Sequence, residues 1–360
     1  MFSYNSIKCR YLLGLGMCMF IFSSCIDELI NTQALNGTLV ISGQLSNSEK
    51  FREVLVLNVT DNLGAGDSLD AEVSLYKDGQ LWLDFTQVGP GRYRLPESAK
   101  IEADNSYFIE VLLADELYRS QEQLVAPKAS TDTISYRVLS EAEFSQEDRE
   151  ATEPIVLKGI EFSAHFNLPP VNEGEVYYRW VVDECWSFVE SNKTDTCYVR
   201  EAIESNTFSL LSNTDPDVQT GEVKIPIMRQ ALDKSFHYQH YVNAYIHSVD
   251  QSTYEYYSKV KRLDGTSGTI YDEVPGPIDG NITNLNDPDI KPSGFVEFFL
   301  ADTFRFRLKR DFIPSNVPDQ CWDIPGGGPC PPDPTVPCKC LACEAICGED
   351  SKTPPDYWID

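Results

Sequence analysis

The sequence predicts an all-β protein with two β-sandwich-like domains in tandem, followed by a tail rich in cysteine and proline. Short runs dominated by Val, Ile, Leu, Tyr and Phe recur from Thr38 onward, several of them alternating between apolar and polar residues. Breaks such as DNLGAGDS, KDGQ and VGPG separate these runs and are typical of hairpin turns. No helical window of about 10 to 15 residues lies between the early runs, so βαβ units are not expected.

The first residues have the pattern of a signal peptide. Lys8 and Arg10 precede an apolar run over residues 11–22, after which two serines lead to Cys25. A basic start, an apolar centre and a small-residue end are typical of a cleaved signal. The run is too short to cross a bilayer as a helix, which takes about 20 residues. Residues 1–24 are therefore predicted to be removed as a lipoprotein signal peptide.

The residues around Cys25 indicate a membrane anchor. A Cys directly after two serines resembles a bacterial lipobox, in which the thiol is acylated and the following residues, here 25–36, form a tether. Asp27 and Glu28 resemble the signal that exports lipoproteins of the Bacteroidota to the outer face of the outer membrane. We therefore expect a lipid-anchored outer-membrane protein that faces the cell exterior. The alternative is an ordinary secretory signal in which Cys25 is incidental.

The charge of the chain excludes one class of partner. Loss of Lys8 and Arg10 with the signal peptide leaves 27 basic against 56 acidic residues, a net charge of −29. Nucleic acid is excluded as a partner, because phosphate binding needs clustered Lys and Arg. An acidic surface also repels anionic headgroups, so acyl chains have to supply the membrane contact.

Residues 37–128 are predicted to form the first sandwich. Its runs are TLVISGQL, EVLVLNVT, AEVSLYKDG, QLWLDFTQ, GRYRL, SYFIEVLL and ELYRSQEQLV. Their order of strands and turns resembles the prealbumin-like and carboxypeptidase-regulatory-like sandwiches of bacterial surfaces.

Residues 129–312 are predicted to form a second, mostly β domain. After the strand DTISYRVL, the acidic stretch EAEFSQEDREATEP has the composition of a solvated loop. Strands resume at IVLKGIEFSAHFNLP and continue to GFVEFFLADTFRFRL. From about Ser252 the pattern also fits an amphipathic helix.

Eight cysteines follow Cys25, and an even number in an oxidising compartment predicts disulfides. These are Cys185, Cys197, Cys321, Cys330, Cys338, Cys340, Cys343 and Cys347. The first two flank the turn-rich SNKTD, which predicts a bridge that closes a hairpin. The last six lie in residues 313–360, a tail that we expect disulfides to staple. Metal ligation by its C-x-C-x2-C-x3-C run is the alternative.

Catalytic signatures are missing from the sequence, which has no H-E-x-x-H, G-x-S-x-G or phosphate-binding P-loop motif. We predict no enzyme, no cofactor and no metal site. His237, His240 and His247 lie in FHYQHYVNAYIH, where strand alternation places His240 on the opposite face from the other two. We interpret them as half-buried, hydrogen-bonding side chains, with a metal or acid–base role as the alternative.

Two triplets predict covalent modification. Asp67-Ser68-Leu69 and Asp132-Thr133-Ile134 resemble the O-glycosylation acceptor of the Bacteroidota, with Ser68 and Thr133 as the modified residues.

The order of these features resembles a Bacteroidota lipoprotein family of unknown function, domain of unknown function 4249. The most specific segments are STYEYY at Ser252–Tyr257, Asn281-Ile282 ahead of Gly294-Phe295, and the Cys-rich tail that closes in TPPDYW. Genes of this family commonly lie beside TonB-dependent outer-membrane transporters, which implies an accessory or substrate-capturing role at the cell surface.

The function expected from these observations is that of a binding or accessory partner of a TonB-dependent transporter, with an unspecified ligand. Aromatic residues such as Trp82, Trp186 and Trp322 could contact a ligand or partner, although each could equally belong to a core. The alternative is a structural or adhesive surface protein, followed by a hydrolase without a recognisable motif.

Overall fold

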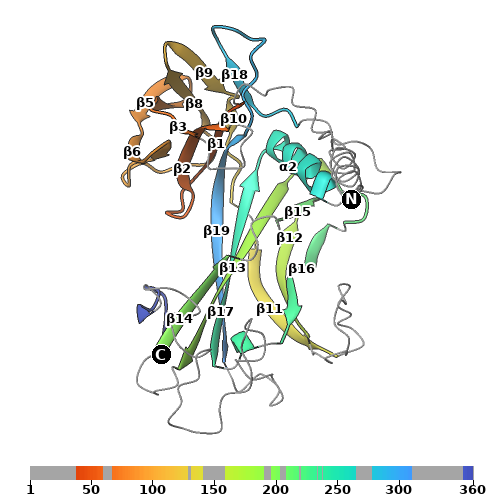
Figure 1. Ribbon diagram of the computed structural model, residues 1–360. Helices are drawn as coiled ribbons and strands as arrows, with labels where there is room; N and C mark the ends of the chain where they lie inside the picture. Colours follow the sequence, from red (N-terminus) through yellow and green to blue (C-terminus); the bar gives the residue numbers. More distant parts are fainter. Residues whose placement is uncertain are drawn as a thin grey trace, which may run out of the picture.

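The computed structural model describes residues 38–59, 67–128, 131–140, 159–189, 196–202, 208–218, 220–232, 234–236, 238–264, 278–309 and 352–359. In these residues the chain is built of β-strands arranged in three sheets (Figure 1), which confirms the predicted all-β class. No helix in the described ranges is long and apolar enough to cross a membrane.

The largest sheet has ten strands and extends through the whole molecule. Its main order is β14-β13-β17-β19-β1-β2-β7-β6, with β15 added to β13 and β3 added to β2. The strands are β14 (Thr196–Ala202), β13 (Tyr177–Val189), β17 (Gln239–Val249), β19 (Val296–Lys309), β1 (Thr38–Ser46), β2 (Arg52–Val59), β7 (Arg92–Arg94), β6 (Thr86–Gly89), β15 (Ser209–Ser212) and β3 (Asp67–Ser68).

Two smaller sheets pack against it. One has the order β18-β9-β8-β4-β5 with β10 on β8, and the other has the order β11-β12-β16. The first consists of β18 (Ile282–Asn284), β9 (Glu116–Ser120), β8 (Ser106–Leu113), β4 (Glu72–Lys77), β5 (Gln80–Asp84) and β10 (Gln123–Leu124). The second consists of β11 (Thr131–Leu139), β12 (Gly159–Leu168) and β16 (Gly221–Ala231). Two short 3-10 helices, η1 (Val171–Glu173) and η2 (Lys234–Phe236), connect strands.

β19 belongs to both sandwiches. Its first residues pair in parallel with β1, from Gly43 opposite Val296 to Ser46 opposite Phe299. The rest of the strand pairs antiparallel with β17, from Ser248 opposite Leu300 onward. No turn separates the two ladders, so one extended strand runs from the upper part of the molecule to the lower part (Figure 1).

Strand alternation gives β19 two different faces. The even-numbered residues Val296, Phe298 and Leu300 belong to the core of the first sandwich, and further along Leu308 belongs to the core of the second. Phe299 lies on the opposite face, in a smaller aromatic cluster. The two main cores therefore lie on one face of the large sheet, and the other face is left for smaller covering elements.

The helix α2 (Gln251–Asp264) is one of these covering elements. Asp250 caps its start, because its Oδ1 accepts a hydrogen bond of 2.8 Å from the backbone N–H of Thr253. The ring of Tyr256 stacks on Phe295, with centroids 4.2 Å apart. The helical pattern that the sequence shows from about Ser252 is thus confirmed.

The boundary predicted between residues 128 and 129 stays a prediction, but strands that come late in the sequence also pair with the first sandwich. β18 pairs with β9, and the start of β19 pairs with β1. Asn281 binds the backbone of Val296 on the edge of β19 that does not face β1. The side-chain amide of Asn281 donates to the carbonyl of Val296 (2.7 Å) and accepts from the N–H of Val296 (2.9 Å). This contact places Asn281 against the start of the strand that follows Gly294-Phe295. The acidic stretch 141–154 lies outside the described residues, as do the first four residues of the strand predicted after it.

Gly294 allows β19 to approach β1. It has φ +103°, and a Cβ atom there would lie 2.2 Å from the carbonyl oxygen of Ile41. The neighbouring backbone is tied down, because Ile41 N–H donates to Ser293 O (2.9 Å) and Gly43 N–H donates to Phe295 O (3.0 Å). Only a residue without a side chain fits this position.

We predict that Gly294→Ala lowers the free energy of unfolding by about 3 kcal/mol, because it combines left-handed strain with a backbone clash. Gly79→Ala is the matched control, since Gly79 has φ +75° but nothing within 4 Å of its Cβ position. The control should lose only about 1 kcal/mol. Urea-induced unfolding followed by circular dichroism measures both, and equal losses would refute the role given to the close approach.

Candidate functional site

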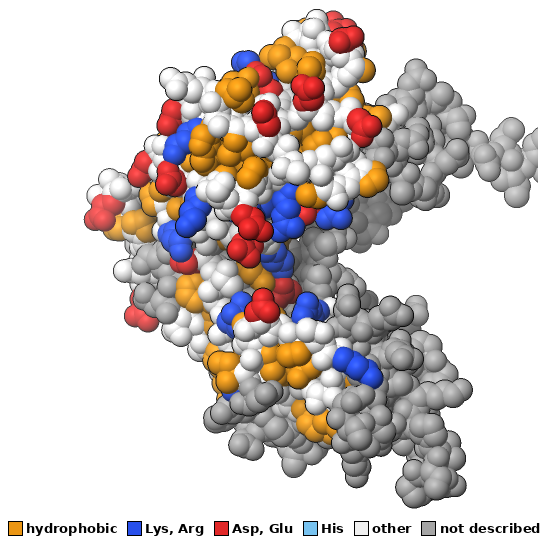
Figure 2. Space-filling model, turned by 90° about the vertical axis from the view of Figure 1, so that its left-hand side faces the viewer, with side chains coloured by type: hydrophobic (Ala, Val, Ile, Leu, Met, Phe, Trp, Pro, Cys, Tyr) orange, Lys and Arg blue, Asp and Glu red, His pale blue; other side chains and the backbone are white. Residues whose placement is uncertain are grey.

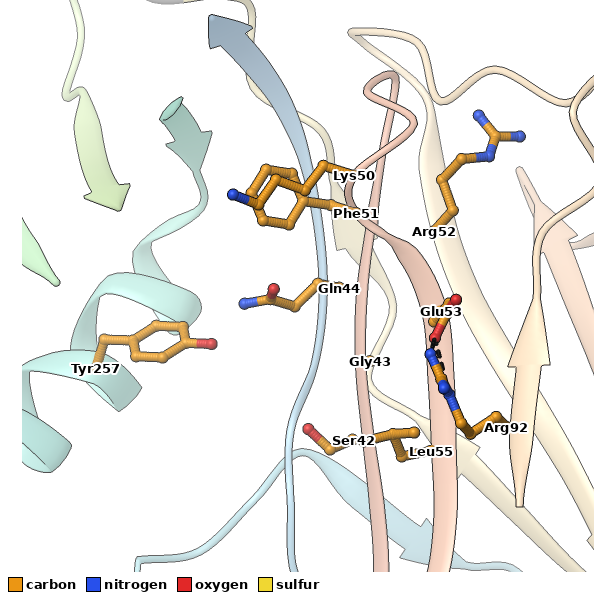
Figure 3. Close-up of a pocket in the computed structure, with 10 residues that line it drawn as sticks. All are labelled: Ser42, Gly43, Gln44, Lys50, Phe51, Arg52, Glu53, Leu55, Arg92 and Tyr257. Carbon is orange, nitrogen blue, oxygen red and sulfur yellow. Dashed lines mark hydrogen bonds and ion pairs between the residues drawn. The ribbon is translucent and has the colours of Figure 1, made fainter. Parts of the chain in front are cut away.

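A pocket with a volume of about 640 Å³ lies where the first sandwich meets α2. Its lining comes from β1, β2, β7, the β1–β2 hairpin and the helix (Figure 3): Ser42, Gly43, Gln44, Lys50, Phe51, Arg52, Glu53, Leu55, Arg92 and Tyr257. The pocket is on the face of the large sheet that is turned away from the two main cores. We call it the junction pocket.

Alternation along the strands explains which side chains reach the pocket. Ile41 and Leu45 of β1 point into the first core, so Ser42 and Gln44 point the other way. Figure 3 shows the side chains of Gln44 and Tyr257 pointing toward each other, with the pair Arg92 and Glu53 farther from the helix.

Two of the three cationic side chains in the lining, Lys50 and Arg92, are ion-paired, whereas Arg52 donates to backbone carbonyls. Arg92 Nη2 lies 2.6 Å from Glu53 Oε2. Lys50 forms an ion pair with Asp183 of β13, and its ammonium lies 4.0 Å from the ring centroid of Tyr245. These contacts fix the positions of the two cationic side chains.

The carboxyl group of Glu297 joins the pocket wall to the second sandwich. Its Oε1 accepts three hydrogen bonds: from Arg179 Nη2 (2.5 Å), from Gln44 Nε2 (2.8 Å) and from the hydroxyl of Tyr257 (2.9 Å). These donors come from β13, β1 and α2. Glu297 is fully buried, so a charge partner is needed to keep it ionised there.

Burial and charge act in opposite directions on this carboxyl. Burial raises the pKa of Glu297 above its usual value, whereas Arg179 and the two neutral donors, Tyr257 and Gln44, lower it. The pKa of the Tyr257 hydroxyl is also raised, chiefly by burial and then by the nearby carboxylate. Tyr257 therefore stays a hydroxyl and keeps donating to Glu297 at neutral pH.

His247 completes this cluster from β17. Its Nδ1 lies 2.9 Å from Nη2 of Arg179 and must accept that hydrogen bond, because a guanidinium only donates. Burial, followed by the charges of Arg179 and Lys50, holds the pKa of His247 well below its usual value. The imidazole is therefore neutral. We refer to Gln44, Arg179, His247, Tyr257 and Glu297 as the junction cluster.

The β1–β2 hairpin inserts an aromatic side chain beside the junction cluster. The ring of Phe51 lies 4.6 Å from His247, 5.5 Å from Tyr245 and 5.5 Å from Phe299, measured between centroids. His247 also stacks on Phe299 at 4.0 Å. This packing attaches the tip of the first sandwich to the second and closes one side of the pocket.

The surface charge is unevenly spread despite the acidic composition. Figure 2 shows Lys and Arg side chains gathered in a band across the middle of one face, with Asp and Glu spread above and among them. The pocket itself has Lys50, Arg52 and Arg92 in its lining, against a single acid, Glu53. Its environment is less acidic than the net charge of the chain suggests.

The lining of the pocket combines polar and apolar side chains. Among the described residues that line it there are hydroxyl, amide, ammonium, guanidinium and carboxylate groups, but neither His nor Cys. Leu55 and Phe51 add apolar surface. Mixed polar and apolar lining in a preformed cavity is typical of a ligand site.

The predicted bridge between Cys185 and Cys197 is wrong. Cys185 is a buried thiol, and Cys197, although disulfide-bonded, is not bonded to it. In the β13–β14 ladder Cys185 lies opposite Arg200, whereas Cys197 lies opposite Phe188. This register places the two cysteines three positions apart along the strands, about 10 Å, which exceeds the reach of a disulfide.

Most other predicted sites lie outside the described residues: Cys25, Asp27, Glu28, Cys321, Cys330, Cys338, Cys340, Cys343 and Cys347. The two predicted O-glycosylation residues lie on strands. Thr133 is an exposed residue of β11, and Ser68 lies opposite Leu57 in the β2–β3 ladder. Their modification stays a prediction.

The structure places His240 and His247 in different surroundings. Both are fully buried rather than half-buried. His240 stacks on Phe236 and lies 3.0 Å from Glu184. No group of three metal-ligating side chains occurs in the described part of the chain. Trp186 is a core residue, whereas Trp82 is 37% exposed.

The family model for a domain of unknown function, DUF4249, matches residues 26–305. The chain belongs to the DUF4249 family. This finding confirms the resemblance drawn from the sequence, and the match covers every described strand except the last four residues of β19. A search of curated proteins finds no match.

Sequence reasoning missed the residues that form the site in this DUF4249 protein. Arg179 and Glu297 are 118 positions apart, and Gln44 and Glu297 are 253 positions apart. The available signal was a single acid inside the otherwise apolar run GFVEFFL, since a charge in a core strand requires a partner.

We predict that Arg179→Met lowers the free energy of unfolding by about 3 to 5 kcal/mol, because Glu297 is left buried without its charge partner. Adding Glu297→Met should recover part of this loss, since an apolar pair replaces the unpaired charge. Urea unfolding of wild type, both single variants and the double variant measures this coupling. Losses that simply add in the double variant would contradict it.

We also predict a pH effect from His247. Its folded pKa is depressed, so below the unfolded value of about 6.5 the unfolded state binds a proton that the folded state does not. Stability from this group is thus complete above pH 6.5 and is lost as the pH falls, by up to about 1.4 kcal/mol per pH unit.

The comparison of wild type with His247→Gln isolates this term, because other titrating groups are common to both. The unfolding free energy of the wild type minus that of the variant should be constant from pH 7 to 8. Below pH 6.5 this difference should decrease, because the wild type loses stability that the variant does not. A difference that stays flat down to pH 5 would show that His247 is protonated in the folded protein.

Proposed function

We propose that this DUF4249 protein is an outer-membrane lipoprotein that captures a ligand in the junction pocket as an accessory of a TonB-dependent transporter. The observation that carries the binding role is the junction pocket, whose lining presents paired charges, an amide and a hydroxyl beside apolar surface. Anchorage through Cys25, export by Asp27 and Glu28, and a disulfide-stapled tail are parts of this proposal.

The support for binding rather than catalysis lies in how the pocket's groups are engaged. Gln44 and Tyr257 both donate to the buried Glu297, so their positions are fixed before any ligand arrives. Preorganised polar groups reduce the entropy lost on binding. The transporter role is supported by what the family resemblance implies about neighbouring genes.

The first test is affinity purification of the native protein from detergent-solubilised outer membranes, followed by mass spectrometry. We expect a TonB-dependent barrel at stoichiometric amounts, and its absence would sink the transporter role and favour the structural or adhesive alternative. Cys25→Ser is the control for anchorage. It should leave the membrane fraction if the lipid is attached at that residue.

The second test concerns the pocket. A panel of short peptides and oligosaccharides is screened by thermal shift against the wild type and Leu55→Trp, which fills the pocket because Leu55 lines it and is 36% exposed. Leu81→Trp is the matched control, since Leu81 is 58% exposed on β5 and does not line the pocket. A ligand of the pocket stabilises the wild type and Leu81→Trp but not Leu55→Trp. Equal stabilisation of all three would place the site elsewhere.

A further inference from the structure

The C-terminal residues 352–359 lie beside β14 (Figure 1). They contact Tyr241 and Asn243, which by alternation are on the same side of β17 as His247, so they lie on the face of the large sheet that carries the junction cluster. They form no strand and still make specific contacts. The indole of Trp358 lies between two tyrosines, with its ring centroid 4.9 Å from Tyr198 of β14 and 4.8 Å from Tyr241 of β17.

Tyr357 occupies an adjacent position on β17 and β19. Its ring faces the guanidinium of Arg305 at 3.7 Å, within the range of a cation–π contact. Its hydroxyl accepts a hydrogen bond of 3.2 Å from Asn243 Nδ2. The amide of Asn243 is fully buried, donates to Asp183 (2.7 Å) and accepts from Arg305 Nε (2.8 Å). Contacts within the sheet therefore fix Asn243 and Arg305, the side chains that bind Tyr357, without help from the C-terminal segment.

Three further hydrogen bonds reach the backbone of the segment. The N–H of Ile359 donates to the hydroxyl of Tyr241 (3.1 Å), and Gln239 Nε2 donates to the carbonyl of Ile359 (2.8 Å). Arg200 donates to the carbonyl of Thr353 (3.4 Å). Residues 355–358 form a turn closed by the hydrogen bond from Trp358 N–H to Pro355 O (2.8 Å). Aromatic anchors combined with hydrogen bonds to the ligand's backbone are a means by which proteins recognise short peptides.

We infer that the surface formed by Tyr198, Gln239, Tyr241, Asn243 and Arg305 is a recognition site for a short aromatic peptide, and that residues 352–359 are its ligand, held in cis. The anchors of the peptide are the adjacent side chains of Tyr357 and Trp358. Because the segment belongs to the same chain, its effective concentration at the surface is high, and a free peptide of the same sequence competes poorly.

The test uses the full chain with Tyr357→Ala and Trp358→Ala, which removes both anchors and preserves chain length and all cysteines. The probe is a fluorescent synthetic peptide of residues 352–360, and binding is followed by anisotropy. We expect the double variant to bind the peptide at least tenfold more tightly than the wild type does. A peptide with both anchors replaced by Ala should not bind.

Further variants in the double-variant background locate the site. Arg305→Ala should weaken peptide binding at least tenfold. Arg119→Ala is the matched control, because Arg119 makes a comparable cation–π contact with Phe108 on the six-stranded sheet, at 5.1 Å. A double variant that keeps the native circular dichroism spectrum but binds no peptide would overturn the proposal, and so would equal losses in both arginine variants.

Hydrogen exchange in the wild type and in single arginine variants gives an independent measurement. It does not require the double variant to fold. The amide of Ile359 should be protected, and Arg305→Ala but not Arg119→Ala should remove that protection. An unprotected amide would overturn the proposal. A dimer that forms only when residues 357 and 358 are intact would overturn the cis assignment by showing that the segment binds a second copy.

Discussion

The pairing of β19 with two partners is the constraint on which the rest of the structure depends. One continuous strand completes a parallel ladder with β1 and then an antiparallel ladder with β17, so the two sandwiches share a sheet. Alternation along this strand then separates core residues from the opposite face. Glu297 lies on that opposite face at the crossing point, where a buried carboxylate requires Arg179. The junction cluster follows from the geometry of the shared strand.

Within the described ranges, three separate elements cover the opposite face of the large sheet. The helix α2 contributes Tyr257, the β1–β2 hairpin contributes Phe51, and the C-terminal segment contributes Trp358. Each element contributes an aromatic side chain to this face, because large rings bury much area from a small attachment. The junction pocket is the space between the first two elements, and its walls therefore come from parts of the chain far apart in sequence.

The sequence was sufficient for features that depend on local patterns. Alternation in segments such as SYFIEVLL predicted strands, and the spacing after Ser252 predicted α2. Features that depend on pairing between distant segments could not be predicted, since register and partner leave no local signal. The contact of Gln44 with Glu297 is of this kind. The error at Cys185 has the same origin, because spacing in the sequence does not specify which residues a hairpin register brings opposite each other.

The parallel pairing of β1 with β19 also affects the order in which the chain can fold. Gln44 meets its partner Glu297 only after 253 further residues have been synthesised, so the edge of β1 stays unpaired until almost the whole chain is available. Topologies with such distant pairings fold slowly, because loop closure precedes the contacts that stabilise it. An unpaired strand edge is also prone to aggregate. A nascent chain of this topology therefore has to be kept apart from its neighbours until β19 emerges.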